Sequence, residues 1–171
     1  MKKIIILDDE VQILKSLKRS LVREGWDVLA FDDPEVALSY ARTGFFSVAI
    51  SDYKMPAMDG VDFLRAFKKL QPLCSTIMLS GQADHEGMSR AINYSVVDHF
   101  MDKPWSERSL LDQVDKAKNL FVRKLAIQRK ANKSAMSKEE YKNWHEQLLE
   151  KVDPGITRVC KNEMGWIELE K

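Results

Sequence analysis

The sequence contains few residues that could stabilise a fold through disulfide bonds or a structural metal site. Its two cysteines, Cys74 and Cys160, lie far apart and have no partner at metal-binding spacing. Such a pair is typical of reduced thiols in the cytoplasm, not of a disulfide framework or a zinc finger. We therefore expect a cytoplasmic protein that depends on a buried core, which 171 residues with 44% hydrophobic content can build.

Long apolar runs are also missing. The run Ile4–Leu7 ends at Asp8 after only four residues. A membrane-spanning helix needs about 20 apolar residues, and the core of a secretory signal needs about 7–15. Neither a membrane partner nor a secretory route is therefore expected.

Charge is unevenly distributed, although the net charge is only +1. Residues 1–115 carry 14 Lys and Arg against 18 Asp and Glu, whereas residues 116–171 carry 13 against 8. No acidic residue lies between Asp115 and Glu139, and this stretch contains eight basic residues. The pattern indicates an acidic first unit followed by a basic connector.

Short apolar runs alternate with amphipathic stretches through the first 115 residues. The expected strands cover residues 4–7, 26–31, 48–51, 76–80 and 98–101. Helical periodicity follows each of them, including a short helix at 85–93 and a long one that begins at Ser106. Five strand–helix units predict an α/β fold with a five-stranded, doubly wound parallel sheet.

Polar residues follow four of these strands at their carboxyl ends, where parallel sheets place their functional sites. They are Asp8, Asp9 and Glu10 after the first strand, Asp52 after the third, Ser80 after the fourth and Lys103 after the fifth. No glycine-rich phosphate loop follows the first strand, which argues against a dinucleotide or nucleoside triphosphate site. Several carboxylates, a hydroxyl and an ammonium are thus expected to meet at one sheet edge.

This combination of groups suits phosphoryl transfer. Crowded carboxylates raise one another's pKa unless a cation neutralises them, and an all-oxygen site suits Mg²⁺. An aspartate can accept a phosphoryl group covalently. Lys103 and Ser80 would then supply a positive charge and a hydroxyl donor to the phosphoryl oxygens, which is most of what this reaction requires.

Together with the segment Asp52–Gly60 and the pair Lys103-Pro104, these residues resemble the receiver domain of two-component response regulators. The order and spacing agree over residues 1 to about 122. The resemblance implies a flavodoxin-like receiver fold and a Mg²⁺ cofactor. It also implies phosphorylation by a sensor histidine kinase or a phosphotransfer protein. Self-catalysed phosphoryl transfer and hydrolysis of the acyl phosphate would be its only chemistry, so we do not expect a conventional enzyme.

The resemblance also assigns roles to single residues. The implied metal ligands are Asp8, Asp9, Asp52 and the backbone carbonyl of Lys54. The implied catalytic residues are Asp52 as phosphoacceptor, with Lys103 and Ser80 contacting the phosphoryl group. Ser80 and Phe100 occupy the two switch positions, and Lys54 and Gln82 occupy positions that tune hydrolysis. The Lys103–Pro104 peptide bond would be cis.

Other interpretations of the same residues stay open. Asp8 and Asp9 could cap the first helix. The basic segment 116–138 could contact DNA, although we favour a solvated linker because no helix-turn-helix motif follows. A metal-dependent phosphatase would need a second aspartate two residues after its nucleophile, which the adjacent pair Asp8-Asp9 does not provide.

The last fifty residues resemble no output domain that we recognise. We expect the receiver domain to cover residues 1–122, and a basic helical extension or linker to cover 123–136. Residues 137–171 would form a module of one helix and a β-hairpin. In it, Ser137 and Glu140 form a capping box that starts a helix to about Lys151. The expected output is a downstream protein partner or a second copy of the chain.

Overall fold

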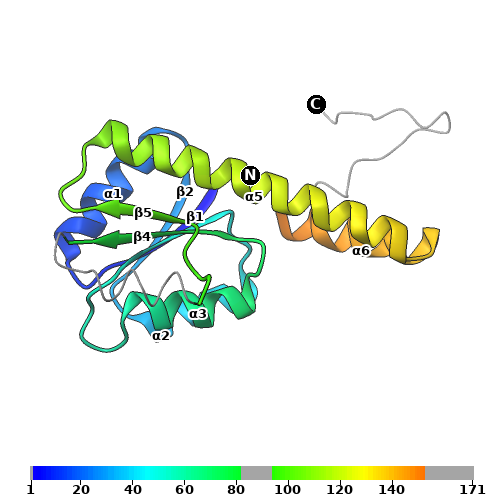
Figure 1. The fold of residues 1–171 in the computed structure, drawn as a ribbon, viewed down its shortest axis with the longest axis horizontal. Helices are drawn as coiled ribbons and strands as arrows, with labels where there is room; N and C mark the ends of the chain where they lie inside the picture. Colours follow the sequence, from blue (N-terminus) through cyan, green and yellow to red (C-terminus); the bar gives the residue numbers. More distant parts are fainter. Residues whose placement is uncertain (1, 82–93, 153–171) are drawn as a thin grey trace, which may run out of the picture. The chain divides into compact units, whose positions relative to one another are not determined.

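The computed structural model describes residues 2–81 and 94–152, and it divides into two compact units at Leu125 and Ala126. The strands are β1 (Lys3–Leu7), β2 (Asp27–Phe31), β3 (Val48–Asp52), β4 (Ser75–Ser80) and β5 (His99–Asp102). They form one parallel sheet in the order β2-β1-β3-β4-β5 (Figure 1). The predicted five-stranded parallel sheet is thereby confirmed, although β5 begins at His99 instead of Asp98.

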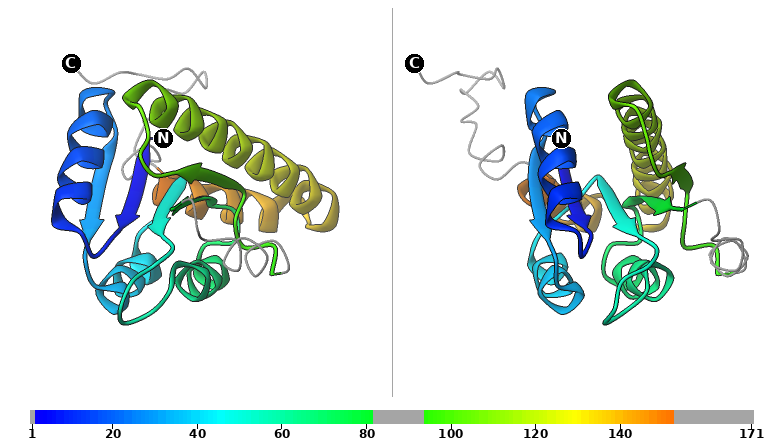
Figure 2. Two further views of the ribbon diagram at one scale, coloured as in Figure 1. Left: turned by 60° about the vertical axis from the view of Figure 1, so that its left-hand side comes forward. Right: turned by 90° about the vertical axis from the view of Figure 1, so that its left-hand side faces the viewer.

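Helices cover both faces of this sheet. They are α1 (Val11–Arg23), α2 (Pro34–Thr43), α3 (Gly60–Leu70) and the first part of α5 (Glu107–Ala135). Figure 2 shows α1 and α5 on one face, with α2 and α3 on the other. The strand β1 serves both layers, because Ile4 and Ile6 pack toward α1 and α5 while Ile5 and Leu7 pack toward α2 and α3. A strand buried on both faces accounts for the unbroken apolar run.

Local sequence explains where the helices begin. The Asp33 side chain accepts hydrogen bonds from the backbone amides of Glu35 and Val36, and Pro34 occupies the first turn of α2. In the same way, the Asp59 side chain accepts a hydrogen bond from the amide of Asp62 at the start of α3. The cap of α3 holds its first turn directly after the loop that follows β3.

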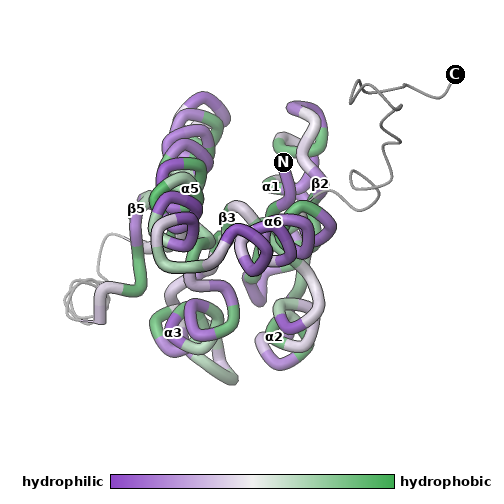
Figure 3. Tube along the Cα trace, turned by 90° about the vertical axis from the view of Figure 1, so that its right-hand side faces the viewer, coloured by the Kyte–Doolittle hydropathy of each residue, from purple (hydrophilic) through white to green (hydrophobic). Residues whose placement is uncertain are grey.

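The helix α5 is amphipathic over the part that belongs to the first unit. Its buried residues are Leu110, Val114, Ala117, Phe121 and Leu125. Figure 3 shows hydrophobic positions recurring on a mostly hydrophilic helix. The helix continues without a break past Leu125 to Ala135.

The second unit contains the end of α5 and the helix α6 (Lys138–Val152). The predicted capping box is confirmed, because the Ser137 amide donates to Glu140 Oε2 at 2.8 Å and the Glu140 amide donates to Ser137 Oγ at 3.3 Å. The expected β-hairpin and the expected helix at 85–93 lie outside the described residues. Across residues 2–81 and 94–152, no helix has both the length and the apolar character that crossing a membrane requires.

Candidate functional site

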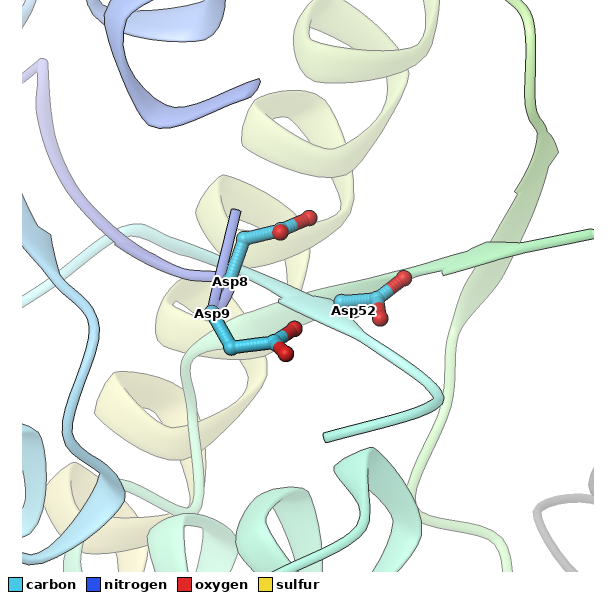
Figure 4. A group of neighbouring side chains, drawn as sticks. All are labelled: Asp8, Asp9 and Asp52. Carbon is cyan, nitrogen blue, oxygen red and sulfur yellow. The ribbon is translucent and has the colours of Figure 1, made fainter. Parts of the chain in front are cut away.

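Three aspartates meet at the carboxyl ends of β1 and β3. Asp8, Asp9 and Asp52 each offer one carboxylate oxygen, and these atoms all lie within 4.8 Å of one another (Figure 4). The cause is strand pairing, since β1 and β3 are neighbours and Leu7 pairs with Ser51. Asp8 is fully buried and Asp52 is 6% exposed, whereas Asp9 faces solvent. The sequence prediction that these acids converge is therefore confirmed.

Lys103 joins this group from the end of β5. Its Nζ atom lies 2.7 Å from Asp52 Oδ1 and 3.0 Å from Asp8 Oδ2. The Glu10 carboxylate is more distant, at 3.9 Å, and largely exposed. The backbone amide of Lys103 donates to the carbonyl of Ser80 at 2.8 Å, and the following bond to Pro104 is cis, as expected. One ammonium thus bridges two buried carboxylates.

Burial and pairing act against each other on the ionisation of these groups. Burial raises the pKa of Asp8, although the Glu10 amide, which donates to Asp8 Oδ1 at 2.8 Å, and Lys103 both oppose this effect. Burial likewise raises the pKa of Asp52 against the opposing influence of Lys103, and the charge of Asp8 raises it further. Lys103 balances only one of the two negative charges, so a further cation would stabilise the ionised site.

The behaviour of Lys103 agrees with this electrostatic balance. Burial alone would lower the pKa of its ammonium, but hydrogen bonds to Asp52 and Asp8 raise it overall. The ammonium therefore stays charged beside the carboxylates. A permanent positive charge next to Asp52 is the kind of group that stabilises an incoming phosphoryl oxygen.

The donor set fits Mg²⁺. Carboxylate oxygens are the hard ligands that this ion prefers, and it needs few of them because it keeps several waters. The exposed position of Asp9 leaves one side of the cluster open to solvent. Lys54 lies in the loop after β3 with an exposed side chain, two residues beyond Asp52. The capping alternative receives little support, because the N-cap of α1 is Glu10, whose side chain makes no capping hydrogen bond.

The two expected switch residues occupy different places. Ser80 ends β4 at the same sheet edge and is 2% exposed. Among the described residues, its buried Oγ has no hydrogen-bond partner. Phe100 is half-buried and packs against the core between the sheet and the helices α2 and α3, in register with Met78. Gln82 lies outside the described residues.

Gly60 has a contact that sequence reasoning did not predict. A Cβ atom at this position would lie 2.0 Å from the backbone oxygen of Asp52, so α3 can approach the end of β3 only because residue 60 has no side chain. The Gly60 amide also donates to the Tyr53 carbonyl at 2.9 Å. The only available signal was the glycine itself, which ends the segment Asp52–Gly60.

Comparisons with known proteins agree with this geometry. The family described as the response regulator receiver domain matches residues 4–115. The response regulator TodT from Pseudomonas putida is 35% identical over 170 residues, covering 98% of this chain and 71% of TodT. The hydrogenase transcriptional regulatory protein HoxA from Bradyrhizobium diazoefficiens is 28% identical over 118 residues, which are 69% of this chain.

A solved structure shows the same fold. The CheY-like response regulator receiver domain protein from Methanospirillum hungatei JF-1 superposes with a TM-score of 0.68 at 31% identity, covering 72% of this chain and 98% of that protein. Some curated relatives are much longer, and the chain spans only 24% of the length of HoxA. The likeness to these long regulators therefore concerns their receiver domains.

Proposed function

The chain belongs to the response regulator receiver domain family of two-component systems, and we propose that it is a phosphorylation-dependent switch that accepts a phosphoryl group on Asp52. A sensor histidine kinase or a phosphotransfer protein would be the donor. The observation that carries the proposal is the 2.7 Å contact between Lys103 Nζ and Asp52 Oδ1 inside the aspartate cluster. This contact sets a fixed positive charge beside a carboxylate that could act as a nucleophile.

The cluster would hold Mg²⁺ through Asp8, Asp9, Asp52 and the backbone carbonyl of Lys54. When bound, this ion would offset the negative charge of the carboxylates and of the phosphoryl oxygens. A carboxylate oxygen of Asp52 would form a bond to phosphorus as the bond between phosphorus and the donor's histidine nitrogen breaks. The imidazole would keep the electron pair. The ammonium of Lys103 would then pair with a phosphoryl oxygen.

Ser80 would turn this chemistry into a change of state. Its buried hydroxyl has no partner among the described residues, so it is available to donate to a phosphoryl oxygen. Phosphorylation adds about −1.5 to −2 charges at the sheet edge. Movement of Ser80 toward that charge, with repacking of Phe100 on the neighbouring strand, would shift an existing equilibrium between two conformations.

The output would be altered binding to a downstream protein or to a second copy of the chain. We assign phosphoacceptance to residues 1–122 and linkage to the basic stretch 123–136, and we assign output either to residues 137–171 or to the surface of β5 and the helix expected at 85–93. No conventional substrate turnover is proposed, because the acyl phosphate on Asp52 would be both formed and hydrolysed at the same site.

Binding of beryllofluoride, a mimic of the phosphoryl group, tests the acceptor role. In the presence of Mg²⁺, the wild-type chain should bind it, and the Asp52→Ala variant should not. The matched control is Asp32→Ala, which removes an exposed carboxylate that follows the edge strand β2 at the same end of the sheet. The control should bind as the wild type does. Equal binding by wild type and Asp52→Ala would remove Asp52 from this role.

DNA binding by residues 116–138 is the second candidate function. Its support is that this stretch, most of which lies in α5, contains eight basic residues and no acidic one. The structure weakens it, because Lys116 pairs with Asp112 and Lys124 pairs with Asp98. A gel shift on duplex DNA at low and high salt distinguishes the two functions. Binding that weakens steeply with salt would support DNA contact, and no shift at low salt would end this interpretation.

A further inference from the structure

A second charged cluster lies at the opposite end of the strands from the aspartate site. Its centre is Asp98, which directly precedes β5. Lys68 Nζ from α3 lies 2.8 Å from Asp98 Oδ2, and Lys124 Nζ from α5 lies 2.8 Å from Asp98 Oδ1. Because α3 and α5 cover opposite faces of the sheet (Figure 2), one carboxylate connects both helical layers around the edge strand.

The carboxylate of Asp98 is held in place independently of the two lysines. Its Oδ2 atom accepts a hydrogen bond from the Thr76 amide at 2.9 Å, and its own amide donates to the Thr76 carbonyl at 3.1 Å. The Thr76 hydroxyl donates to the Val96 carbonyl at 2.7 Å. These contacts fix Asp98 to the start of β4, so it is a firm attachment point for a helix.

The side chains of the cluster are largely buried. The exposed fractions of the side chains of Lys68, Asp98 and Lys124 are 16%, 18% and 26%. Burial alone would raise the pKa of Asp98, but hydrogen bonds from Lys124 and Lys68 lower it to about 2. The carboxylate therefore remains ionised, and salt screens these pairs less than it screens exposed ones.

The cluster lies close to the boundary between the two compact units in the sequence. Lys124 lies one residue before Leu125, where the first compact unit ends, and α5 runs on without a break into the second unit. Asp98 lies two residues before Phe100, directly before the strand that leads to Lys103. The same strand thus connects the aspartate site with the root of the helix that leaves the receiver unit.

We propose that Asp98 is an ionic clamp that holds α5 at Lys124 and so couples the receiver unit to the C-terminal unit. While Lys124 is paired with Asp98, the turns of α5 around Lys124 stay attached to the start of β5 and do not fray. The contact of Phe121 with Phe45, at 5.9 Å between ring centroids, and the burial of Leu125 do not involve the clamp. Opening the clamp therefore loosens the helix without unfolding the receiver.

Substitutions of the two lysines that pair with Asp98 distinguish the clamp from a merely structural role of the cluster. Lys124→Met removes the α5 half of the cluster, whereas Lys68→Met removes the α3 half with the same change of charge. Hydrogen exchange of α5 amides in residues 118–130 is measured without ligand, and circular dichroism monitors the fold. If Lys124→Met loses its native spectrum, Lys124→Gln takes its place. This variant removes the charge that forms the ion pair but keeps a polar side chain, and the same rise in exchange is expected.

Exchange in this segment should rise about tenfold in Lys124→Met, because local opening of the helix no longer has to break the clamp. It should stay within about twofold of wild type in Lys68→Met, since Asp98 still holds Lys124. Equal exchange in wild type and Lys124→Met, or an equal rise in both variants, would overturn the clamp. This comparison does not depend on phosphorylation.

A second arm tests the coupling, which rests on the proposed function. Beryllofluoride with Mg²⁺ should change exchange in residues 126–152 of the wild type and of Lys68→Met. In Lys124→Met it should bind equally well but leave these residues unchanged. Binding to wild type without any change in 126–152, or a full response in Lys124→Met, would overturn the coupling. Failure of the wild type to bind beryllofluoride would instead overturn the proposed function, and the clamp would still be decided by the ligand-free comparison.

Discussion

Lys103 Nζ lies 2.7 Å from Asp52 Oδ1, although β4 separates the strands from which the two residues come. The long lysine side chain spans this neighbouring strand and ends between Asp52 and Asp8. The ammonium and the two buried carboxylates form the electrostatic centre of the site. The stability of the metal-free protein should therefore depend on this lysine.

Replacing Lys103 by Met should lower the free energy of unfolding by about 3 kcal/mol, because it leaves two buried carboxylates without their ammonium. Added Mg²⁺ should stabilise this variant more than it stabilises the wild type, since the ion replaces the missing positive charge. Urea unfolding with and without Mg²⁺ measures both effects. Lys116→Met is the control, because its pair with Asp112 is exposed and should contribute less than about 0.5 kcal/mol. Similar losses in both variants would contradict the prediction.

The hydroxyl of Ser80 should matter for the switch and not for stability. Because Ser80 Oγ has no partner in the described part of the chain, Ser80→Ala should change the free energy of unfolding by less than about 0.5 kcal/mol. Ser51 is also buried, but its hydroxyl donates to the Asp52 carbonyl at 2.9 Å, so Ser51→Ala should cost about 1 kcal/mol. Beryllofluoride titrations should show weaker binding in Ser80→Ala. The reverse order of stabilities would refute this assignment.

Gly60 should be required for the position of Asp52. In Gly60→Ala, the new Cβ would lie 2.0 Å from the Asp52 oxygen and 3.1 Å from the Tyr53 Cα, both of them backbone atoms. We expect a loss of about 2–3 kcal/mol in unfolding free energy and weaker Mg²⁺ binding measured by calorimetry.

The matched control for this substitution is Gly44→Ala. Its Cβ would lie 2.7 Å from the buried ring of Phe46 and 3.0 Å from the Tyr40 backbone oxygen, so it also strains the fold, but at the end of α2 and away from Asp52. This variant should keep the Mg²⁺ affinity of the wild type. Unchanged Mg²⁺ affinity in Gly60→Ala would show that the close approach does not position Asp52.

The Asp98 cluster should make stability depend on acidic pH. The pKa of Asp98 is lowered from its ordinary value of 3.8 to about 2, so the folded state favours the ionised form. This contribution is fully present above about pH 5, amounts to about 2 kcal/mol, and is lost as pH falls through 2. Burial acts in the opposite sense on Asp8 and Asp52, whose raised pKa values oppose folding as pH rises.

The substitution Asp98→Asn isolates the contribution of Asp98 to the pH dependence of stability. Between about pH 5 and 3, wild type should lose about 1 kcal/mol more unfolding free energy than Asp98→Asn. Urea unfolding at each pH measures the difference. The control Asp27→Asn opens an exposed pair with Lys3 and should cost less than about 0.5 kcal/mol of unfolding free energy. Parallel curves for wild type and Asp98→Asn would mean that this carboxylate is not stabilised in the folded state.

Much of the fold could be predicted because it depends on local patterns. Alternating apolar runs and helical stripes predicted all five strands and the buried face of α5, and the helix caps follow from single residues such as Asp33 and Ser137. The meeting of Asp8, Asp9 and Asp52 was also predictable, since parallel strands bring their carboxyl ends to one edge of the sheet. Element ends were less certain, as the start of β5 at His99 instead of Asp98 shows.

The specific contacts could not be predicted, because they depend on how side chains distant in sequence pack in three dimensions. Which carboxylate oxygens Lys103 reaches, whether the Ser80 hydroxyl finds a partner, and how closely Gly60 approaches Asp52 all depend on this packing. In the same way, Lys68 and Lys124 appeared in the sequence only as charges on two helices. The folding of both helical layers around the edge of β5 brings them to a single carboxylate.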